Sequence, residues 1–277
     1  MPIFLASALV HGVDRIQPVL DPPPAVPGTP ELAGRTVMVV MPAYNAAKTL
    51  AQTWQAIPKE WIDRVILVDD GSRDETVQVA EQLHLHVIRH PHNVGYGGNQ
   101  KTCYMEALRL GADVVVMLHP DGQYDPTLLP DLVKPILAGD ADFVLGSRFA
   151  AKDGPKKGGM PLYKRLANRF LTMCENLALG SHFSELHTGY RAYSRRFLET
   201  VPFLRNSNDF VFDTEVIAQA VTFGFKVAEV PVETRYFPEA SSANLRQSLT
   251  YGFKTLWIMA KHLANRLHVG RSKLFRR

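Results

Sequence analysis

The chain has 277 residues, of which 46% are hydrophobic and 21% charged, which is ordinary for a globular protein and enough for one large α/β domain or two small ones. Its cysteines, Cys103 and Cys174, lie far apart in the sequence, which excludes a disulfide framework and a cysteine zinc site and suits a reducing compartment. The net charge of +4 comes without a basic patch interleaved with aromatic residues, and no apolar run approaches roughly 20 residues, so neither nucleic-acid binding nor a membrane-spanning helix is expected.

Residues 1–34 include Pro22, Pro23, Pro24, Pro27 and Pro30 and are predicted to form an extended leader outside the fold. The apolar stretch over residues 1–10 has no basic lead, so a secretory signal is not predicted. The folded part of the chain is therefore expected to begin near residue 35.

Short apolar runs alternate with helix-length segments between residues 35 and 149. Strands are predicted at 37–41, 65–68, 86–88, 113–118 and 142–145. Helices are predicted at 47–57, at 74–83, from the end of the glycine-rich segment 93–99 to about residue 110, and at 127–137. Five alternations predict an α/β fold with a mostly parallel sheet and helices on both faces.

The pattern changes after residue 149. Residues 152–159 form a loop rich in Gly and Lys that is predicted to be a lid, with Lys152, Lys156 and Lys157 over donor phosphates; an ordinary solvated loop is the alternative. Further predicted elements are helices at 162–179 and 213–223, a strand at 189–193, and an edge strand over 227–235 that Pro231 interrupts.

Residues 244–267 carry apolar side chains at steps of three and four, which predicts an amphipathic C-terminal helix. No acidic residue follows Glu239, whereas eight basic residues do, so the tail is basic and the rest of the chain mildly acidic. A basic amphipathic helix is typical of contact with an anionic membrane surface, and a helix packed on the domain is equally compatible.

Polar residues follow five of the predicted strands, where an open α/β sheet binds its ligands. The clearest case is the apolar run 65–68, which is followed directly by Asp69, Asp70, Gly71 and Ser72. Five polar strand ends at one sheet edge predict a ligand cleft; the segments are Pro42–Asn45, Asp69–Asp70, Asn93–Asn99, His119–Gln123 and Gly146–Arg148.

Two of these segments contain residue types that could bind a metal ion or a phosphate. His119, Asp121 and Gln123 alternate, so in an extended conformation they would share one side and could hold Mn²⁺ or Mg²⁺; a β-turn is the alternative, because Pro120 and Gly122 favour turns. The glycines of residues 93–99 could bring backbone N–H groups to a phosphate, but a glycine-rich turn explains them as well.

The motifs Val-Met-Pro-Ala-Tyr-Asn, Val-Asp-Asp-Gly-Ser, Asn-Val-Gly-Tyr-Gly-Gly-Asn, an acidic metal motif and Gly-Ser-Arg occur in this order. Together they resemble the family 2 glycosyltransferases of the GT-A fold, especially the branch of dolichyl- and polyprenyl-phosphate sugar synthases. The resemblance spans roughly residues 35–240. It implies that a sugar moves, with inversion, from a nucleotide-diphosphate donor to an acceptor expected to be polyprenyl phosphate in cell-envelope glycan synthesis, with Mn²⁺ or Mg²⁺ as cofactor.

The resemblance also implies a division of the chain and a set of donor-side residues. Residues 35–149 would be the nucleotide-sugar half, 150–240 the acceptor half, and 241–277 the basic C-terminal helix and tail. His119, Asp121 and Gln123 fall on the metal ligands of the family. The implied nucleotide-sugar contacts are Pro42, Ala43, Tyr44, Asn45, Asp69, Asp70, Asn93, Gly95 and Gly98.

Further residues are implied on the acceptor side and in catalysis. Thr188, Gly189 and Arg191 match the acceptor segment of the family. The implied catalytic residues are Asp121, Asp213, Glu215, Arg148 and Arg235. A lipid phosphate needs no strong base to attack, whereas a saccharide hydroxyl would use Asp213 or Glu215 as its base; for these two acids a capped helix start is the alternative.

Two departures leave an alternative open. Ala46 stands where the family often has Glu, and His119 stands for the first acid of the metal motif, so both changes remove negative charge. A non-catalytic sugar-nucleotide binder with a decayed metal site is therefore the alternative class. A nucleotidyltransferase is disfavoured, because no glycine-rich loop with Arg or Lys follows the first strand. The enzyme is expected in the cytoplasm, peripherally on the inner face of the membrane.

Overall fold

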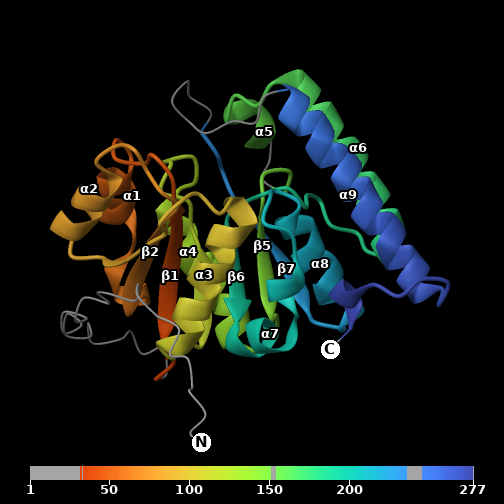
Figure 1. Ribbon diagram of the computed structural model, residues 1–277, viewed down its shortest axis with the longest axis horizontal. Helices are drawn as coiled ribbons and strands as arrows, with labels where there is room; N and C mark the ends of the chain where they lie inside the picture. The colour runs from red at the N-terminus through yellow and green to blue at the C-terminus, as the bar shows by residue number, and fades with distance from the viewer. Residues whose placement is uncertain (1–31, 33, 151–153, 236–244, 277) are drawn as a thin grey trace, which may run out of the picture.

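The computed structural model describes residues 32, 34–150, 154–235 and 245–276 (Figure 1). The proline-rich part of the predicted leader lies outside these residues. Leu32, by contrast, is buried against the first strand, so packing begins slightly before residue 35.

Seven strands form one sheet in the order β3-β2-β1-β4-β6-β5-β7. Their bounds are β1 Val37–Ala43, β2 Arg64–Asp69, β3 His86–Arg89, β4 Val114–Met117, β5 Phe143–Ser147, β6 Arg191–Ser194 and β7 Val227–Pro231. The strand β6 runs antiparallel to both β4 and β5, and the other described pairs are parallel. This confirms the predicted α/β fold with a mostly parallel sheet.

Helices cover both faces of the sheet (Figure 1). The main helices are α1 Leu50–Ala56, α2 Thr76–Gln82, α3 Tyr96–Arg109, α4 Leu129–Leu137, α6 Leu162–Leu179, α7 Arg195–Thr200, α8 Phe212–Thr222 and α9 Leu245–Arg266. Alternate residues of β1 point to opposite faces: Met38 and Val40 pack with α3 and α8, whereas Val39 and Met41 pack with α1 and α4. Because both faces are covered, the strands read as continuous apolar runs.

Most predicted elements are correct to within a few residues, with three differences. The edge strand predicted over 227–235 is confirmed only as β7, which ends with Pro231 rather than being interrupted by it. The strand predicted at 189–193 is the antiparallel insertion β6, Arg191–Ser194. The predicted lid contains a short helix, α5 Gly154–Lys157, rather than a loop alone. Gly158 lies so close to Thr234 that a Cβ there would meet its carbonyl oxygen at 2.2 Å, so this part of the segment is packed against the body.

The helices α6 and α9 lie side by side at one edge of the molecule (Figure 1). The C-terminal helix predicted at 244–267 is therefore confirmed as α9, and it packs on α6 and α8. Within the described ranges, no helix combines the length and the hydropathy needed to cross a bilayer.

Candidate active site

A cleft of about 820 Å³ opens at the carboxyl ends of β1, β2 and β4. Its other walls come from the N-terminal turn of α3, from α6 and from α9. All four residues of the segment Pro42–Asn45 line it. Asn45, which has a positive φ of 53°, is held there because its N–H donates to Ser72 Oγ (2.8 Å) and its Oδ1 accepts from the N–H of Arg73 (2.8 Å).

The carboxylate of Asp70 accepts hydrogen bonds from other groups of the protein. Its Oδ1 accepts a hydrogen bond from the N–H of Val94 (2.8 Å) and lies 2.9 Å from His90 Nδ1, and its Oδ2 accepts from the N–H of Gly95 (3.1 Å). The N–H groups predicted to cradle a phosphate are therefore bonded to a carboxylate. The N–H groups of residues 94–95 therefore anchor this segment to Asp70.

Close packing explains the glycines of this segment. A Cβ on Gly97 would meet the carbonyl oxygen of Ser207 at 2.4 Å, and one on Gly95 would meet that of Asn208 at 2.5 Å. The N–H of Gly97 donates to the carbonyl of Asn208 (2.9 Å). The glycines thus let residues 207–208 approach the start of α3. Asn93 and Gly95 line the cleft; Gly98 is buried against Val94.

Asp69 is buried beside Asp70 but does not appear on the cleft wall. Its Oδ2 accepts from the N–H of Ser72 (3.1 Å), whereas its buried Oδ1 has no hydrogen-bond partner within the described part of the chain. A buried acceptor without a donor is costly, so this atom calls for a donor from outside these residues.

Residues 119–123 do not form the extended segment that would place His119, Asp121 and Gln123 on one side; they contain a turn. Residues 120–121 turn, Gly122 has a φ of +73°, and Asp121 Oδ1 accepts from the N–H of Gln123 (3.0 Å). His119, Asp121 and Gln123 nevertheless all line the cleft. The turn therefore brings together the three side chains that an alternating strand was expected to align.

His119 lies between Tyr96 and Gly189. Its ring stacks on that of Tyr96 with centroids 5.6 Å apart, and its Nε2 is 3.3 Å from Tyr96 Oη. Burial lowers the pKa of His119, although Asp121 and Asp213 act in the opposite direction. The imidazole is therefore neutral at pH 7, which is the form that binds metals.

The donor set fits a divalent cation that keeps open positions. A neutral imidazole, a carboxylate and an amide oxygen suit Mn²⁺ or Mg²⁺, whose remaining ligands would be water and phosphate oxygens. Among the residues that the structure describes, no group of three His, Cys, Asp or Glu side chains forms a closed metal site. His119, Asp121 and Gln123 are the residues that would hold such a cation.

Asp213 is the centre of a buried network. It accepts from Tyr96 Oη (2.8 Å) and from Gln100 Nε2 (3.1 Å), and it forms an ion pair of 3.3 Å with Arg191 Nη1. Burial and the neighbouring Asp213 raise the pKa of Tyr96 well above its usual value, so the phenol stays protonated. Asp213 and Tyr96 line the cleft, as predicted for Asp213; Tyr96 was not predicted.

Glu215 does not lie where a cleft acid was expected. Its Oε2 accepts from the N–H of Ser207 (2.6 Å) and its Oε1 from Ser207 Oγ (2.9 Å), and it is not among the described residues that line the cleft. Burial raises its pKa. This carboxyl holds the segment that packs on the glycines, away from the described cleft wall.

Of the predicted acceptor residues, Gly189 reaches the cleft wall. Its N–H donates to Tyr124 Oη (2.8 Å), and a Cβ would meet the His119 ring at 2.7 Å. Thr188 and Arg191 are buried behind it: Thr188 donates to the carbonyl of Gly146, and Arg191 Nε donates to the carbonyl of Thr188 (2.7 Å). These two side chains support the wall rather than form it.

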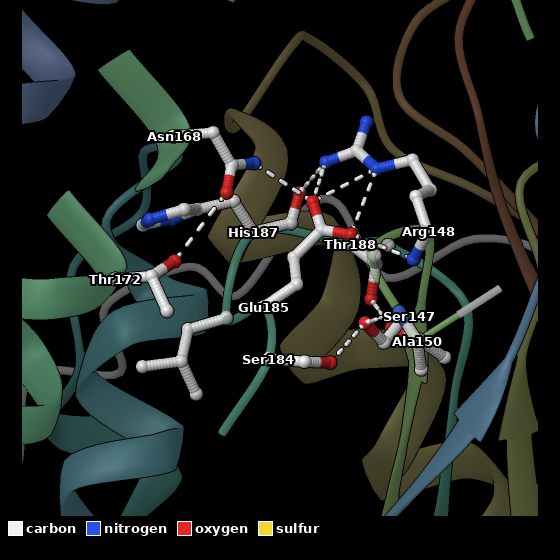
Figure 2. A network of polar contacts seen from close by, with 12 residues as sticks. Ser147, Arg148, Ala150, Asn168, Thr172, Ser184, Glu185, His187 and Thr188 are labelled. Carbon is white, nitrogen blue, oxygen red and sulfur yellow. Dashed lines mark hydrogen bonds and ion pairs between the residues drawn. The ribbon is translucent and has the colours of Figure 1, made fainter. Parts of the chain in front are cut away.

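Arg148 lines the cleft next to a buried carboxylate (Figure 2). Its Nε donates to Glu185 Oε1 (2.8 Å), and Glu185 also accepts from Asn168 Nδ2 (2.7 Å). Lys164 on α6 lines the same end of the cleft, and burial together with Arg148 lowers its pKa. Two cationic side chains therefore lie at the end of the cleft that α6 borders.

The other predicted basic residues lie away from the cleft. The N–H of Arg235 donates to the carbonyl of Gln123 (2.9 Å), but its side chain is exposed and does not contribute to the described cleft wall. Lys156 and Lys157 are exposed on α5 and also lie off that wall, and Lys152 falls outside the described residues. No lysine described on the predicted lid reaches the cleft wall.

The outer faces of α6 and α9 are apolar and exposed. Tyr163, Leu171 and Leu249 of these helices also line the cleft, so the apolar surface continues into it. The exposed large apolar residues of these helices include Leu162, Leu166, Phe170, Met173 and Leu177 on α6, and Leu249, Phe253 and Trp257 on α9.

Comparison with known proteins relates this chain to sugar-transferring enzymes. The family model described as Glycosyl transferase family 2 matches residues 38–201. The chain is 27% identical to the UDP-N-acetylglucosamine–dolichyl-phosphate N-acetylglucosaminyltransferase of Methanococcus voltae, over 74% of this chain and 88% of that protein. It is 29% identical to the polyprenol monophosphomannose synthase of Mycolicibacterium smegmatis, over 74% of this chain and 79% of that protein.

A solved structure shares the fold. The glucosyl-3-phosphoglycerate synthase of Mycobacterium tuberculosis, in complex with Mn²⁺, UDP and glucosyl-3-phosphoglycerate, superposes with a TM-score of 0.62 at 20% identity. The alignment covers 88% of this chain and 84% of that one.

Proposed function

The chain belongs to glycosyl transferase family 2 and is a glycosyltransferase; we propose that it moves a sugar, with inversion, from a nucleotide-diphosphate donor to a polyprenyl phosphate. One observation carries the choice of acceptor. The end of the cleft that bears Arg148 and Lys164 is bordered by the apolar faces of α6 and α9. A pocket with two basic side chains, of which Arg148 is paired with Glu185, beside an exposed apolar surface matches a phosphate that carries a long hydrocarbon chain.

The donor would occupy the opposite end of the cleft. Residues 42–45 offer a wall for the nucleotide base. His119, Asp121 and Gln123 would hold Mn²⁺ or Mg²⁺. Such a cation supplies positive charge against the diphosphate as it leaves.

The transfer itself needs orientation more than acid–base chemistry. The acceptor oxygen forms a bond to the anomeric carbon from one face while the bond to the diphosphate oxygen breaks on the other, which inverts the configuration. A phosphate acceptor is already ionised, so no general base is required. Arg148 and Lys164 would orient it.

Asp213 would position its neighbours rather than take a proton. Its two oxygens already face a phenol, an amide and a guanidinium. The contact with the phenol also fixes Tyr96 against the His119 ring. Asp213 would therefore hold Tyr96, and through it His119, in place in the cleft.

The α6–α9 face would rest on the membrane that holds the acceptor. The two helices contain one acidic residue between them, Glu175, and it is fully buried. Basic side chains accompany the apolar ones: Arg165 and Arg169 on α6, and Lys254 and Lys261 on α9. An apolar stripe with basic flanks suits the interface of an anionic bilayer, so the enzyme would lie peripherally on the cytoplasmic side.

The first test is calorimetric titration with UDP, GDP and dTDP, with and without Mn²⁺. We expect one nucleotide to bind tightly and only with the metal. Transfer is then assayed with the matching sugar nucleotide and either a polyprenyl phosphate or the corresponding polyprenol, which lacks the phosphate. Transfer to the phosphate and not to the alcohol supports the proposal.

Two other results would contradict the proposed function. Nucleotide binding without transfer to any acceptor would favour a non-catalytic sugar-nucleotide-binding protein. Transfer to a saccharide hydroxyl but not to the lipid phosphate would replace the acceptor class.

A further inference from the structure

Phe210 is a large apolar side chain that lies half exposed on the wall of the cleft and that the proposed transfer does not use. Its exposed fraction is 50%, and the two residues before it, Asn208 and Asp209, line the same wall. An aromatic ring that stays in water lacks the stabilisation that burial would give it. Because aromatic side chains in pockets commonly contact the ligand, a bound molecule is expected to cover this ring.

The Phe210 ring belongs to a group of three rings that includes a residue of the metal motif. It packs on Tyr96 with centroids 4.8 Å apart and planes tilted by 35°. The Tyr96 ring in turn stacks on His119, with centroids 5.6 Å apart. A molecule on the exposed part of Phe210 would therefore lie near the diphosphate that the metal motif is proposed to bind.

The segment that carries Phe210 is held by neighbouring helices. Ser207 donates to Glu215 on α8 through its N–H (2.6 Å) and its Oγ (2.9 Å), and Asp209 forms an ion pair with Lys254 on α9. The glycines at the start of α3 pack closely against the same segment. Because the ring is presented by a segment that is already fixed, little conformational freedom is lost when a ligand covers it.

The proposed substrates offer two apolar surfaces, the C–H groups on one face of the donor sugar and the hydrocarbon chain of the acceptor. The apolar side chains at the acceptor end of the cleft come from α6 and α9 and include Tyr163 and Leu249. Phe210 comes instead from the segment before α8 and contacts Tyr96 beside the metal motif. The C–H groups of a sugar carry partial positive charge, which suits the negative face of an aromatic ring. The position of Phe210 therefore favours the sugar.

We propose that Phe210 is the surface on which the sugar of the nucleotide donor stacks. This deepens the proposed function and rests on it, because it assumes a nucleotide-sugar donor. The ring covers the apolar face of the sugar, excludes water from that face and helps to hold the anomeric carbon toward the acceptor. Phe210 is thus a residue that recognises the sugar and not the nucleotide.

The test measures binding without any acceptor, by calorimetry in the presence of Mn²⁺. UDP-glucose, UDP-N-acetylglucosamine, GDP-mannose and dTDP-glucose are each compared with their own nucleoside diphosphate. For the donor that wild type binds, Phe210→Ala should raise the Kd of the sugar nucleotide about 5-fold and leave the Kd of the nucleoside diphosphate unchanged. The KM for polyprenyl phosphate should also stay unchanged.

Two further variants separate the aromatic face from apolar packing, and a third is the matched control. Phe210→Leu keeps an apolar side chain without a ring and should also weaken binding of the sugar nucleotide, whereas Phe210→Tyr keeps the ring and should bind it like wild type. Leu204→Ala removes a side chain that is similarly exposed (55%) but lies off the described cleft wall, and it should change neither Kd. The melting temperature of each variant shows whether it is folded.

The outcomes separate this inference from the proposed function. If wild type binds a sugar nucleotide and transfers its sugar, but folded Phe210→Ala and Phe210→Leu keep the wild-type Kd, the stacking is wrong and the proposed function stands. If the KM for polyprenyl phosphate rises instead, Phe210 contacts the acceptor chain. Equal weakening of sugar nucleotide and nucleoside diphosphate would mean that Phe210 acts through Tyr96 and His119, which also overturns the inference. If wild type binds none of these nucleotides, the proposed function fails and the stacking with it.

Discussion

The hydroxyl of Tyr96 donates a hydrogen bond of 2.8 Å to Oδ2 of Asp213, which joins the first turn of α3 to the first turn of α8 across the floor of the cleft. The same hydroxyl lies 3.3 Å from His119 Nε2. The position of the metal-motif histidine is therefore coupled to a carboxylate almost a hundred residues further along the chain.

Tyr96→Phe should reduce transfer and lower the free energy of unfolding by about 1–2 kcal/mol, because Asp213 loses one of its donors in a buried site. Steady-state kinetics and urea unfolding measure the two effects. Tyr193→Phe removes another buried hydroxyl, 3.4 Å from Tyr104 and outside the cleft, and should leave kcat unchanged. Full activity in Tyr96→Phe would show that the phenol contributes only to packing.

Asp121→Asn should reduce transfer by about 1,000-fold or more and abolish metal-dependent nucleotide binding, because the carboxylate is the anionic ligand of the proposed metal site. The melting temperature should not change, since an amide oxygen can still accept the N–H of Gln123. Asp125→Asn, an exposed carboxyl that caps the next turn, is the control. An active Asp121→Asn enzyme would contradict the metal assignment.

Gly189→Ala should impair transfer, because the new methyl group would overlap the His119 ring at 2.7–2.8 Å and push it from its place. Gly252→Ala on α9 makes a useful comparison, as its Cβ would find Leu171 at an ordinary 3.7 Å. That change should stabilise the fold by about 0.5–1 kcal/mol, since alanine favours a helix interior. Equal activities of the two variants would argue against a role for the position of His119.

Glu215→Gln should lower the melting temperature but keep the kcat of the folded enzyme, because this side chain receives two hydrogen bonds from Ser207 and lies off the cleft wall. A general base, by contrast, contributes typically 100- to 10,000-fold to the rate. Thermal melts and kinetics at matched folded concentration decide between the two roles. A loss of that size in folded Glu215→Gln would restore the residue as a base.

His262 should make the stability depend on pH. It is buried between Thr222 and Phe275, and burial, with Arg266 second, lowers its pKa below the ordinary 6.5. The folded state therefore resists protonation, so its contribution to stability is complete above pH 6.5 and decreases as the pH falls below that value. The fall in melting temperature between pH 7.5 and 5.5 should be smaller in His262→Gln than in wild type; an equal fall would contradict the assignment.

The sheet and the cleft could be predicted because their causes are local. Apolar runs such as 65–68 define buried strands, and the carboxyl ends of parallel strands meet at one edge. Asn45, Asp121 and Arg148 accordingly all reach the cleft. The conformation of residues 119–123 was harder to predict, since an alternating extended strand and a turn at Pro120 and Gly122 fit the same residues.

What the sequence could not show depends on partners distant in the chain. Asp70 binds the N–H groups of residues 94 and 95, and Glu215 binds Ser207, so neither carboxylate reveals its use locally. Tyr96 lies between Gly95 and Gly97 in the segment 93–99, for which phosphate binding was predicted. Its position in that segment is the sequence feature that could have identified it. The position of β6 between β4 and β5 likewise follows from tertiary packing, and the four residues of β6 do not indicate it.

The insertion of β6 has a consequence for how the enzyme is made. Until residues 191–194 are in place, β4 and β5 each present an open edge, and open edges pair readily with other chains. Their closure requires contacts between segments distant in sequence, which form slowly. The donor end of the cleft therefore cannot be produced as an independent fragment: a polypeptide that stops after β5 is expected to aggregate, and during synthesis the site matures only after its second half has emerged.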